Sequence, residues 1–308
     1  MKRPTLQHRL EYVLYLAGSA VVERLPAGVA DGLGASLGRI AHRLGLRRET
    51  ARAQVRAAFP ERDDAWVHDV VRQSYEHIGR EAMAMLRMSR TDVRSSWLAS
   101  AEVVGIDRLL AAWGEGRGLV LVGGHLGNWE LGAAVLASRD MPVDAIAKRL
   151  ANPLIDRAIA DARARLGLRI MHLGGASKRA LQSLREGRVV GFVADQDAGR
   201  AGVFVDFMGR PASTHRGPAL LAIRSGAPMF VGLPLRRPDG GYHLEAVEVR
   251  FDREGDLEEA VRRGTQAFSA VLEEGVRRAP GQYFWQHRRW KSRPPEPSRE
   301  EPEPAGEV

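Results

Sequence analysis

The 308-residue chain contains no cysteine, which excludes disulfide bonds, thiolate nucleophiles and cysteine-ligated zinc. This absence fits a reducing compartment. The sequence also shows no internal repeat, and its N-terminal apolar run, Tyr12 to Val22, is too short to span a bilayer. That run is about half the length of the ~20-residue helix that a membrane span requires, and Glu11 and Glu23 bracket it.

A basic start followed by an apolar run resembles a secretory signal peptide. Here the apolar pattern continues beyond the run, through residues 29–46, with Arg39, His42 and Arg43 interspersed. We therefore predict an amphipathic pair of helices that lies on a membrane surface, rather than a cleaved signal. Ordinary core helices that cap the fold are the alternative that the sequence leaves open.

The charge of the chain is unevenly distributed. It has 46 Lys and Arg against 38 Asp and Glu, a net charge of +8. The Pro- and Glu-rich tail, residues 294–308, carries five glutamates and one arginine, a net charge of −4, which leaves +12 on residues 1–293. We predict that this tail is disordered. The surplus on the rest of the chain favours an anionic partner: nucleic acid, an acidic membrane surface, an acidic protein or a phosphorylated substrate.

Hydrophobic periodicity divides the rest of the chain into two regions. Residues 1–100 carry helical periodicity, whereas residues 101–293 alternate short β-branched runs with helical stretches. The predicted strands are residues 118–124, 143–148, 168–173, 189–195, 227–236 and 242–249. Such alternation predicts an α/β fold with a largely parallel central sheet flanked by helices.

Polar residues follow the first of these strands, in the stretch LVLVGGHLGNWELG. Gly123 and Gly124 end the strand with a turn that bulky side chains resist. Asn128 is a suitable N-cap, so Glu130 falls in the first helical turn, where the helix dipole favours a carboxylate. His125 lies in the turn itself.

The five-residue spacing of His125 and Glu130 disfavours metal binding, because two ligands on one helical face are three or four residues apart and no third ligand lies nearby. It permits an acid–base dyad in which His125 is the general base and Glu130 orients the imidazole and stabilises its charged form. A loop histidine beside a helix-capping glutamate is the alternative.

Several blocks along the chain resemble one protein family. HLGNWE has the HxxxxE pattern of glycerolipid-type acyltransferases. The other blocks are AAFPE (57–61), NPLIDRAIADARARLG (152–167), VADQDAG (193–199), VFVDFMGRPASTHRGPALLAIRSGAP (203–228) and APGQYFWQHRRWKSRP (279–294). In this order they resemble the late acyltransferases of lipid A biosynthesis, the lauroyl and myristoyl transferases of the bacterial inner membrane. Wider relatives acylate phosphatidylinositol mannosides.

The resemblance implies a glycerolipid acyltransferase-like fold and transfer of a fatty acyl chain from an acyl thioester, on acyl carrier protein, to a hydroxyl of a membrane glycolipid. A lipid A precursor is the expected acceptor, with a phosphatidylinositol mannoside as the alternative. It also implies action at the cytoplasmic face of the inner membrane, with no metal or cofactor. His125 would be the base and Glu130 its partner. Arg163 would bind substrate phosphate or the transition state, or else be a solvated charge on a helix face.

Three further sets of residues are candidates for substrate binding. Asp195 and Gln196 end a predicted strand, at the edge where open α/β sheets bind ligands, although turn chemistry also explains them. Thr214 lies in a shaped loop and could instead cap the following helix. Arg288 and Arg289 lie among aromatic residues near the C-terminus.

That C-terminal block, residues 282–293, has three interpretations. Aromatic residues beside cations suit a membrane–water boundary and phosphate binding. They also suit nucleic acid, and packing of a terminal segment against the sheet explains them equally. Arginines scattered over the whole chain and the absence of a recognised nucleic-acid module disfavour nucleic acid. A lipid or nucleic-acid binder without catalysis is the remaining alternative to an enzyme.

Overall fold

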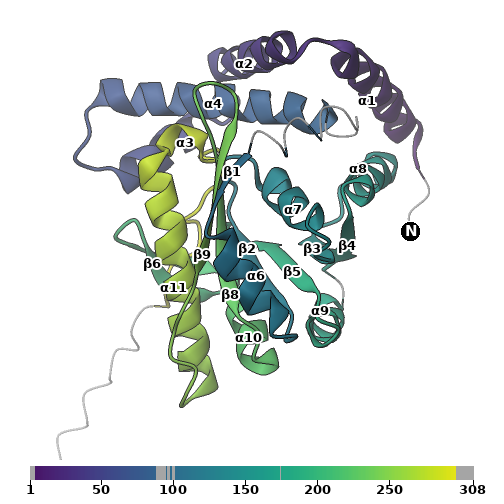
Figure 1. The fold of residues 1–308 in the computed structure, drawn as a ribbon. Helices are drawn as coiled ribbons and strands as arrows, with labels where there is room; N and C mark the ends of the chain where they lie inside the picture. The colour runs from purple at the N-terminus through teal and green to yellow at the C-terminus, as the bar shows by residue number, and fades with distance from the viewer. Residues whose placement is uncertain (1–3, 88–94, 96–97, 99–100, 174, 296–308) are drawn as a thin grey trace, which may run out of the picture.

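The computed structural model describes residues 4–87, 95, 98, 101–173 and 175–295 (Figure 1). The described residues ahead of the sheet are helical, as the periodicity predicts. The long helices are α1 (Leu6–Arg24), α2 (Ala27–Arg43), α3 (Arg48–Ala58) and α4 (Asp64–Arg87). Most of the tail predicted to be disordered, from residue 296 onward, lies outside the described residues.

Strands and helices then alternate. The first half contains β1 (Ala101–Val104), α6 (Ile106–Gly114), β2 (Leu119–Gly123), α7 (Trp129–Ala137), β3 (Val143–Ala147), α8 (Pro153–Arg165), β4 (Leu168–His172), α9 (Ala176–Arg185) and β5 (Val189–Val193). The second half contains β6 (Val203–Phe207), β7 (Arg210–Thr214), α10 (Gly217–Ser225), β8 (Met229–Arg236), β9 (Tyr242–Glu248), α11 (Leu257–Arg278) and the 3₁₀ turn η2 (Pro280–Gln282).

Seven of these strands form the central sheet, in the order β1-β9-β8-β2-β5-β3-β4. Within the described chain its neighbouring strands are parallel, apart from the antiparallel pair β8–β9. Helices lie on both faces (Figure 1). This confirms the predicted α/β fold with a largely parallel sheet.

A separate hairpin, β6–β7, lies where the sequence predicts only a loop. Its two-residue turn is Met208–Gly209, and both residues have positive φ, at 57° and 70°. Such turns match the twist of antiparallel strands and commonly place glycine in this conformation. Gly209 suits this turn, but methionine is uncommon at positive φ and Pro211 disfavours a strand, so the sequence carried no clear hairpin signal.

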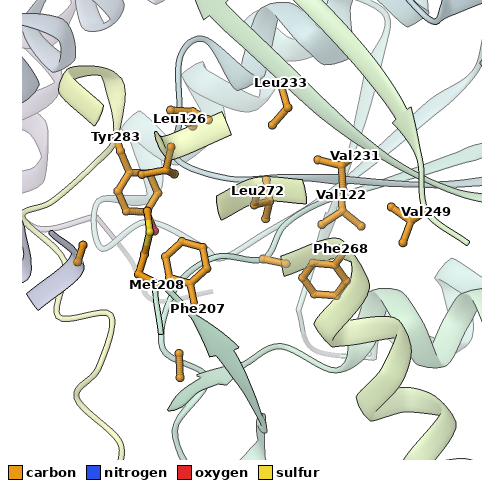
Figure 2. Close-up of a cluster of buried hydrophobic side chains, with 14 of the residues drawn as sticks. Val122, Leu126, Phe207, Met208, Val231, Leu233, Val249, Phe268, Leu272 and Tyr283 are labelled. Carbon is orange, nitrogen blue, oxygen red and sulfur yellow. The ribbon is translucent and has the colours of Figure 1, made fainter. Parts of the chain in front are cut away.

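The hydrophobic core has two layers, one on each face of the sheet. Alternate residues of β2 supply both layers: Val120 and Val122 belong to one cluster and Leu119 to the other. Figure 2 shows Val122 in the first cluster beside Phe268 and other residues of α11. A strand that is buried on both faces has a continuous apolar sequence, and β2 has such a sequence.

The turn that follows β2 depends on glycine at one position above all. Gly127 has φ of +58°, and a Cβ on it would lie 1.8 Å from the carbonyl oxygen of Pro234. A Cβ on Gly123 would meet only the Phe192 carbonyl oxygen, at 3.7 Å. In this turn the strictest requirement for glycine therefore falls at Gly127, three residues beyond the end of the predicted strand.

Replacing Gly127 by alanine is expected to lower the free energy of unfolding by about 2–5 kcal/mol, because a positive φ and an overlapping Cβ both oppose the native turn. Urea denaturation measures the change. Gly132→Ala is the matched control: its Cβ would meet Pro234 at an ordinary 3.8 Å within α7, so stability should be unchanged or slightly higher. If the two variants were equally stable, the turn would be shown to accommodate a Cβ at residue 127.

Candidate active site

The register of two parallel strands brings His125 and Asp195 together. Gly123 of β2 pairs with Val193 of β5, and each candidate residue lies two positions further on. The Asp195 carboxylate accepts two hydrogen bonds from His125: the backbone N–H reaches Oδ2 at 2.8 Å, and ring Nδ1 lies 2.7 Å from Oδ1. One buried carboxylate thus fixes both the turn and the imidazole.

Mutual electrostatics stabilise this pair. Burial raises the pKa of Asp195, but the charge and hydrogen bonds of His125, with Arg289 nearby, hold it down at about 2. Burial lowers the pKa of His125, whereas the charge and hydrogen bond of Asp195 and the charge of Glu130 bring it above its ordinary value. Asp195 therefore stays ionised and retains a proton on Nδ1 of His125, which leaves Nε2 as the basic atom.

Gln196 lies beside that basic atom. Its Nε2 is 3.4 Å from Nε2 of His125, so its amide can donate toward the unprotonated nitrogen. Two aromatic rings confine the imidazole: the centroid of Trp129 is 5.0 Å away and that of Phe284 is 5.9 Å away. Neither ring was predicted to contact His125, although Trp129 lies inside the HLGNWE motif and Phe284 inside the C-terminal aromatic block.

Glu130 is in the first turn of α7, as predicted, and Asn128 caps that helix by accepting from the Leu131 N–H at 2.9 Å. The carboxylate of Glu130, however, pairs with Arg163 of α8. The Nε of Arg163 lies 3.1 and 3.0 Å from the two carboxylate oxygens, and Nη2 also contacts Oε1. The indole Nε1 of Trp129 donates to the same group at 3.2 Å.

These contacts reassign the orienting role expected for Glu130. The two described side chains, His125 and Glu130, share no hydrogen bond, and Asp195 makes the bond that orients the ring. The charge of Glu130 still raises the pKa of the imidazole. For Arg163, the ion pair and its place in the cavity wall disfavour the solvated helix-face alternative.

A cavity of about 1150 Å³ opens beside His125. It exceeds the usual ~300–1,000 Å³ of small-ligand pockets. Much of its wall is apolar and comes from several elements, including Leu121, Ala133, Leu136, Ile146, Leu181, Phe192 and Leu220. Glu130, Arg163, Gln196 and two exposed lysines, Lys148 and Lys178, add polar groups. The cavity suits a ligand with a long apolar part and an anionic part.

Two other candidates lie behind the site. Thr214 ends β7 and does not cap α10: its hydroxyl donates to the Ala212 carbonyl at 3.0 Å and accepts from Nη2 of Arg289. Arg289 is only 2% exposed and donates through Nη1 to the Ser213 carbonyl at 2.7 Å. Neither residue lines the cavity. They support the region around Asp195.

The C-terminal aromatic block braces the turn that holds His125. The Phe284 N–H donates to the His125 carbonyl at 3.0 Å, and the Gly127 N–H donates to the Gln282 carbonyl at 3.1 Å. Tyr283 and Trp285 are buried in the core, whereas Arg288 is exposed. Of the three interpretations of this block, packing against the sheet agrees best with these contacts.

Among the residues that the structure describes, no group of three or more histidine, aspartate or glutamate side chains is placed to hold a metal ion. No described helix combines the length and apolar character needed to cross a membrane.

The histidine at the strand edge, its carboxylate partner and the cavity form an arrangement in which an imidazole nitrogen can accept a proton from a bound ligand. The chain belongs to the bacterial lipid A biosynthesis acyltransferase family, whose model matches residues 1–292. This confirms the family and the enzyme class that the sequence blocks predict.

Curated relatives agree. The chain is 32% identical over 283 residues to the lipid A biosynthesis lauroyltransferase of Escherichia coli K12, covering 89% of each protein. It is 29% identical over 281 residues to the palmitoleoyltransferase of the same organism, covering 88% of each. It is also 31% identical over 224 residues to a phosphatidylinositol mannoside acyltransferase of Mycolicibacterium smegmatis, covering 70% of this chain and 72% of that protein.

Proposed function

We propose that this protein transfers a fatty acyl chain from an acyl thioester to a hydroxyl of a membrane glycolipid, with His125 as the general base. The observation that carries the proposal is the pairing of Nδ1 with Asp195, which leaves Nε2 basic at the edge of the cavity. A hydroxyl that attacks a thioester carbonyl must lose its proton, and a basic imidazole nitrogen can accept it.

In the proposed reaction, Nε2 of His125 accepts the hydroxyl proton as the oxygen attacks the thioester carbonyl. The tetrahedral intermediate then collapses, the C–S bond breaks, and the imidazolium returns the proton to the leaving thiolate. No covalent enzyme intermediate is required. The N–H groups at the start of α7, together with Lys148 and Lys178 of the cavity wall, are the candidates for stabilising the oxyanion.

We propose a lipid A precursor as the acceptor, because the relatives that span most of the chain are lipid A acyltransferases. The mycobacterial relative supports a phosphatidylinositol mannoside as the second candidate. We propose acyl carrier protein as the donor, since the net positive charge of the chain suits an acidic protein.

An anionic membrane surface is the proposed location, at the cytoplasmic face of the inner membrane. Helices α1 and α2 expose a set of large apolar side chains to solvent: Leu6, Leu10, Val13, Leu14, Leu16, Val21, Val29, Leu33, Leu37 and Ile40. A patch of this kind on a water-facing surface is unusual in a monomer and marks a binding surface. Figure 1 shows the two helices together along one side of the molecule, away from the sheet.

The test is transfer of a radiolabelled acyl group from acyl carrier protein to membrane glycolipids, with the product identified by mass. A labelled lipid A species supports the full proposal. A labelled phosphatidylinositol mannoside supports the chemistry and changes the acceptor. If folded, membrane-bound protein labels no lipid with either this donor or acyl coenzyme A, the proposal is wrong.

The rate at limiting substrate is expected to rise with pH, because only the neutral imidazole of His125 accepts a proton. Burial lowers the pKa of this ring, but Asp195 and Glu130 bring it above the ordinary 6.5. The rate should therefore reach half its maximum at a pH above 6.5, and a pH series of kcat/KM measures this midpoint. A rate independent of pH from 5 to 9 would contradict a histidine base.

A further inference from the structure

A second cavity, of about 770 Å³, lies behind the turn that holds His125. Its walls come from the start of α2, from α4, from the connection between β8 and β9, and from η2. Figure 1 shows the β8–β9 hairpin reaching α4 and α2 at this end of the molecule. One wall residue, His77, contacts the catalytic turn, with its Nε2 3.3 Å from the Gly127 carbonyl oxygen.

Five arginines line this second cavity, and four of them have carboxylate partners. Arg80 lies 3.4 Å from Asp31, and Arg236 pairs with Asp31 and with Glu81. The other two paired arginines are Arg237, with Asp239, and Arg278, with Glu245.

The fifth arginine, Arg87, is different. It is only 7% exposed, and among the described residues its buried Nε has no hydrogen-bond acceptor and no carboxylate lies within ion-pair distance of its guanidinium. Arginine is almost never buried without a partner, because an uncompensated charge loses its hydration. Its guanidinium therefore calls for an anion from outside the described chain.

We propose that this second cavity binds a phosphate group through Arg87, and that the phosphate belongs to the headgroup of an anionic phospholipid. The guanidinium fork matches two phosphate oxygens, and the cavity wall carries five arginines against three carboxylates, Asp31, Glu76 and Asp239. The inference is independent of the acyl transfer proposed above, because none of the wall residues is a proposed member of the catalytic site.

The neighbouring surface favours a lipid as the source of that phosphate. Gly28 and Ala30 of α2 line the cavity, and the adjoining Val29 is 55% exposed. Leu33, one helical turn further on, is 38% exposed and continues the apolar face. A ligand with a phosphate in the cavity and acyl chains along this face would cover both the unpaired cation and the exposed apolar side chains.

The experiment compares wild type with Arg87→Gln, using two probes and no acyl donor. The first probe is inorganic phosphate, titrated calorimetrically at constant ionic strength. The second is sedimentation with vesicles of phosphatidylglycerol and phosphatidylcholine, against vesicles of phosphatidylcholine alone. Loss of a charge-assisted pair should weaken binding by about tenfold or more. Arg52→Gln is the charge-matched control, since Arg52 is an exposed residue of α3 that pairs with Asp64.

A loss confined to Arg87→Gln on phosphatidylglycerol vesicles supports the lipid headgroup. A loss of phosphate binding without any change on vesicles supports the phosphate site but overturns the lipid source. If Arg87→Gln and Arg52→Gln bind phosphate equally well and bind the vesicles equally well, the proposed phosphate site is wrong.

A second variant keeps the test valid if Arg87→Gln fails to fold. Gly28→Asp places a carboxylate at the cavity wall, and nothing lies within 4 Å of the added Cβ. The position is in the first turn of α2, where an acidic residue favours the helix. This variant should fold and also bind phosphate and phosphatidylglycerol about tenfold more weakly, because like charges repel. Binding equal to that of wild type would overturn the proposal.

Discussion

Replacing His125 by alanine is expected to lower the rate of acyl transfer by about 10²–10⁴-fold, the usual contribution of a general base. The physical reason is that Nε2 is the basic atom at the cavity edge, fixed in place by Asp195, so no other described group takes its position. The measurement is kcat from the labelled-acyl assay, compared with wild type at the pH of maximal rate.

The matched control for this change is His68→Ala, on the exposed surface of α4. It removes an imidazole of the same size at a position outside the cavity and should leave the rate near that of wild type. Both variants should show the circular dichroism of the wild-type fold. A folded His125→Ala protein with full activity would rule out this residue as the base.

Replacing Asp195 by asparagine is expected to lower the rate by a similar factor, about 10²–10⁴-fold. In the wild type, one oxygen of the Asp195 carboxylate accepts from the His125 backbone N–H and the other accepts from Nδ1–H. An amide has one acceptor oxygen, so its NH₂ group must face one of these donors or turn the ring. If it donates to Nδ1, the proton moves to Nε2 and the base is lost.

The pH profile separates this mechanism from a simple loss of stability. Asp195 provides most of the effects that raise the pKa of His125, and burial, which lowers it, remains in the variant. The residual activity of Asp195→Asn should therefore reach half its maximum at a lower pH than wild type. An unchanged profile with unchanged kcat would show that the buried carboxylate does not act on the imidazole.

The two carboxylates near His125 thus differ in role because they differ in position. Asp195 follows a strand that is the hydrogen-bonded neighbour of β2, so its side chain meets the imidazole. Glu130 begins a helix, and its bidentate contact with Arg163 joins α7 to α8 across the cavity. That contact places the Glu130 carboxylate where its charge raises the pKa of the His125 imidazole without a hydrogen bond to the ring.

The sequence by itself determined the motif and most of the elements, although β1 and the β6–β7 hairpin were not predicted. Runs of Val and Leu bounded by glycine defined β2 and β5, Asn128 marked the start of α7, and the HLGNWE pattern singled out His125. These features are local: each depends on the conformation of a few consecutive residues and on which of them must be buried. The family was also predicted from local information, because each block that resembles the family is a short stretch of consecutive residues.

Tertiary structure alone decided which side chains meet. The partner of His125 is 70 residues away at Asp195 and the partner of Glu130 is 33 residues away at Arg163. The short spacing between His125 and Glu130 favoured Glu130 as the partner of the histidine. Spacing along the chain contains no information on strand order, so it could not indicate Asp195. Only the β2–β5 register brings Asp195 to the ring, and only the packing of η2 and β8 against the turn makes Gly127 indispensable. Pairings across a sheet depend on non-local contacts, which short-range patterns do not contain.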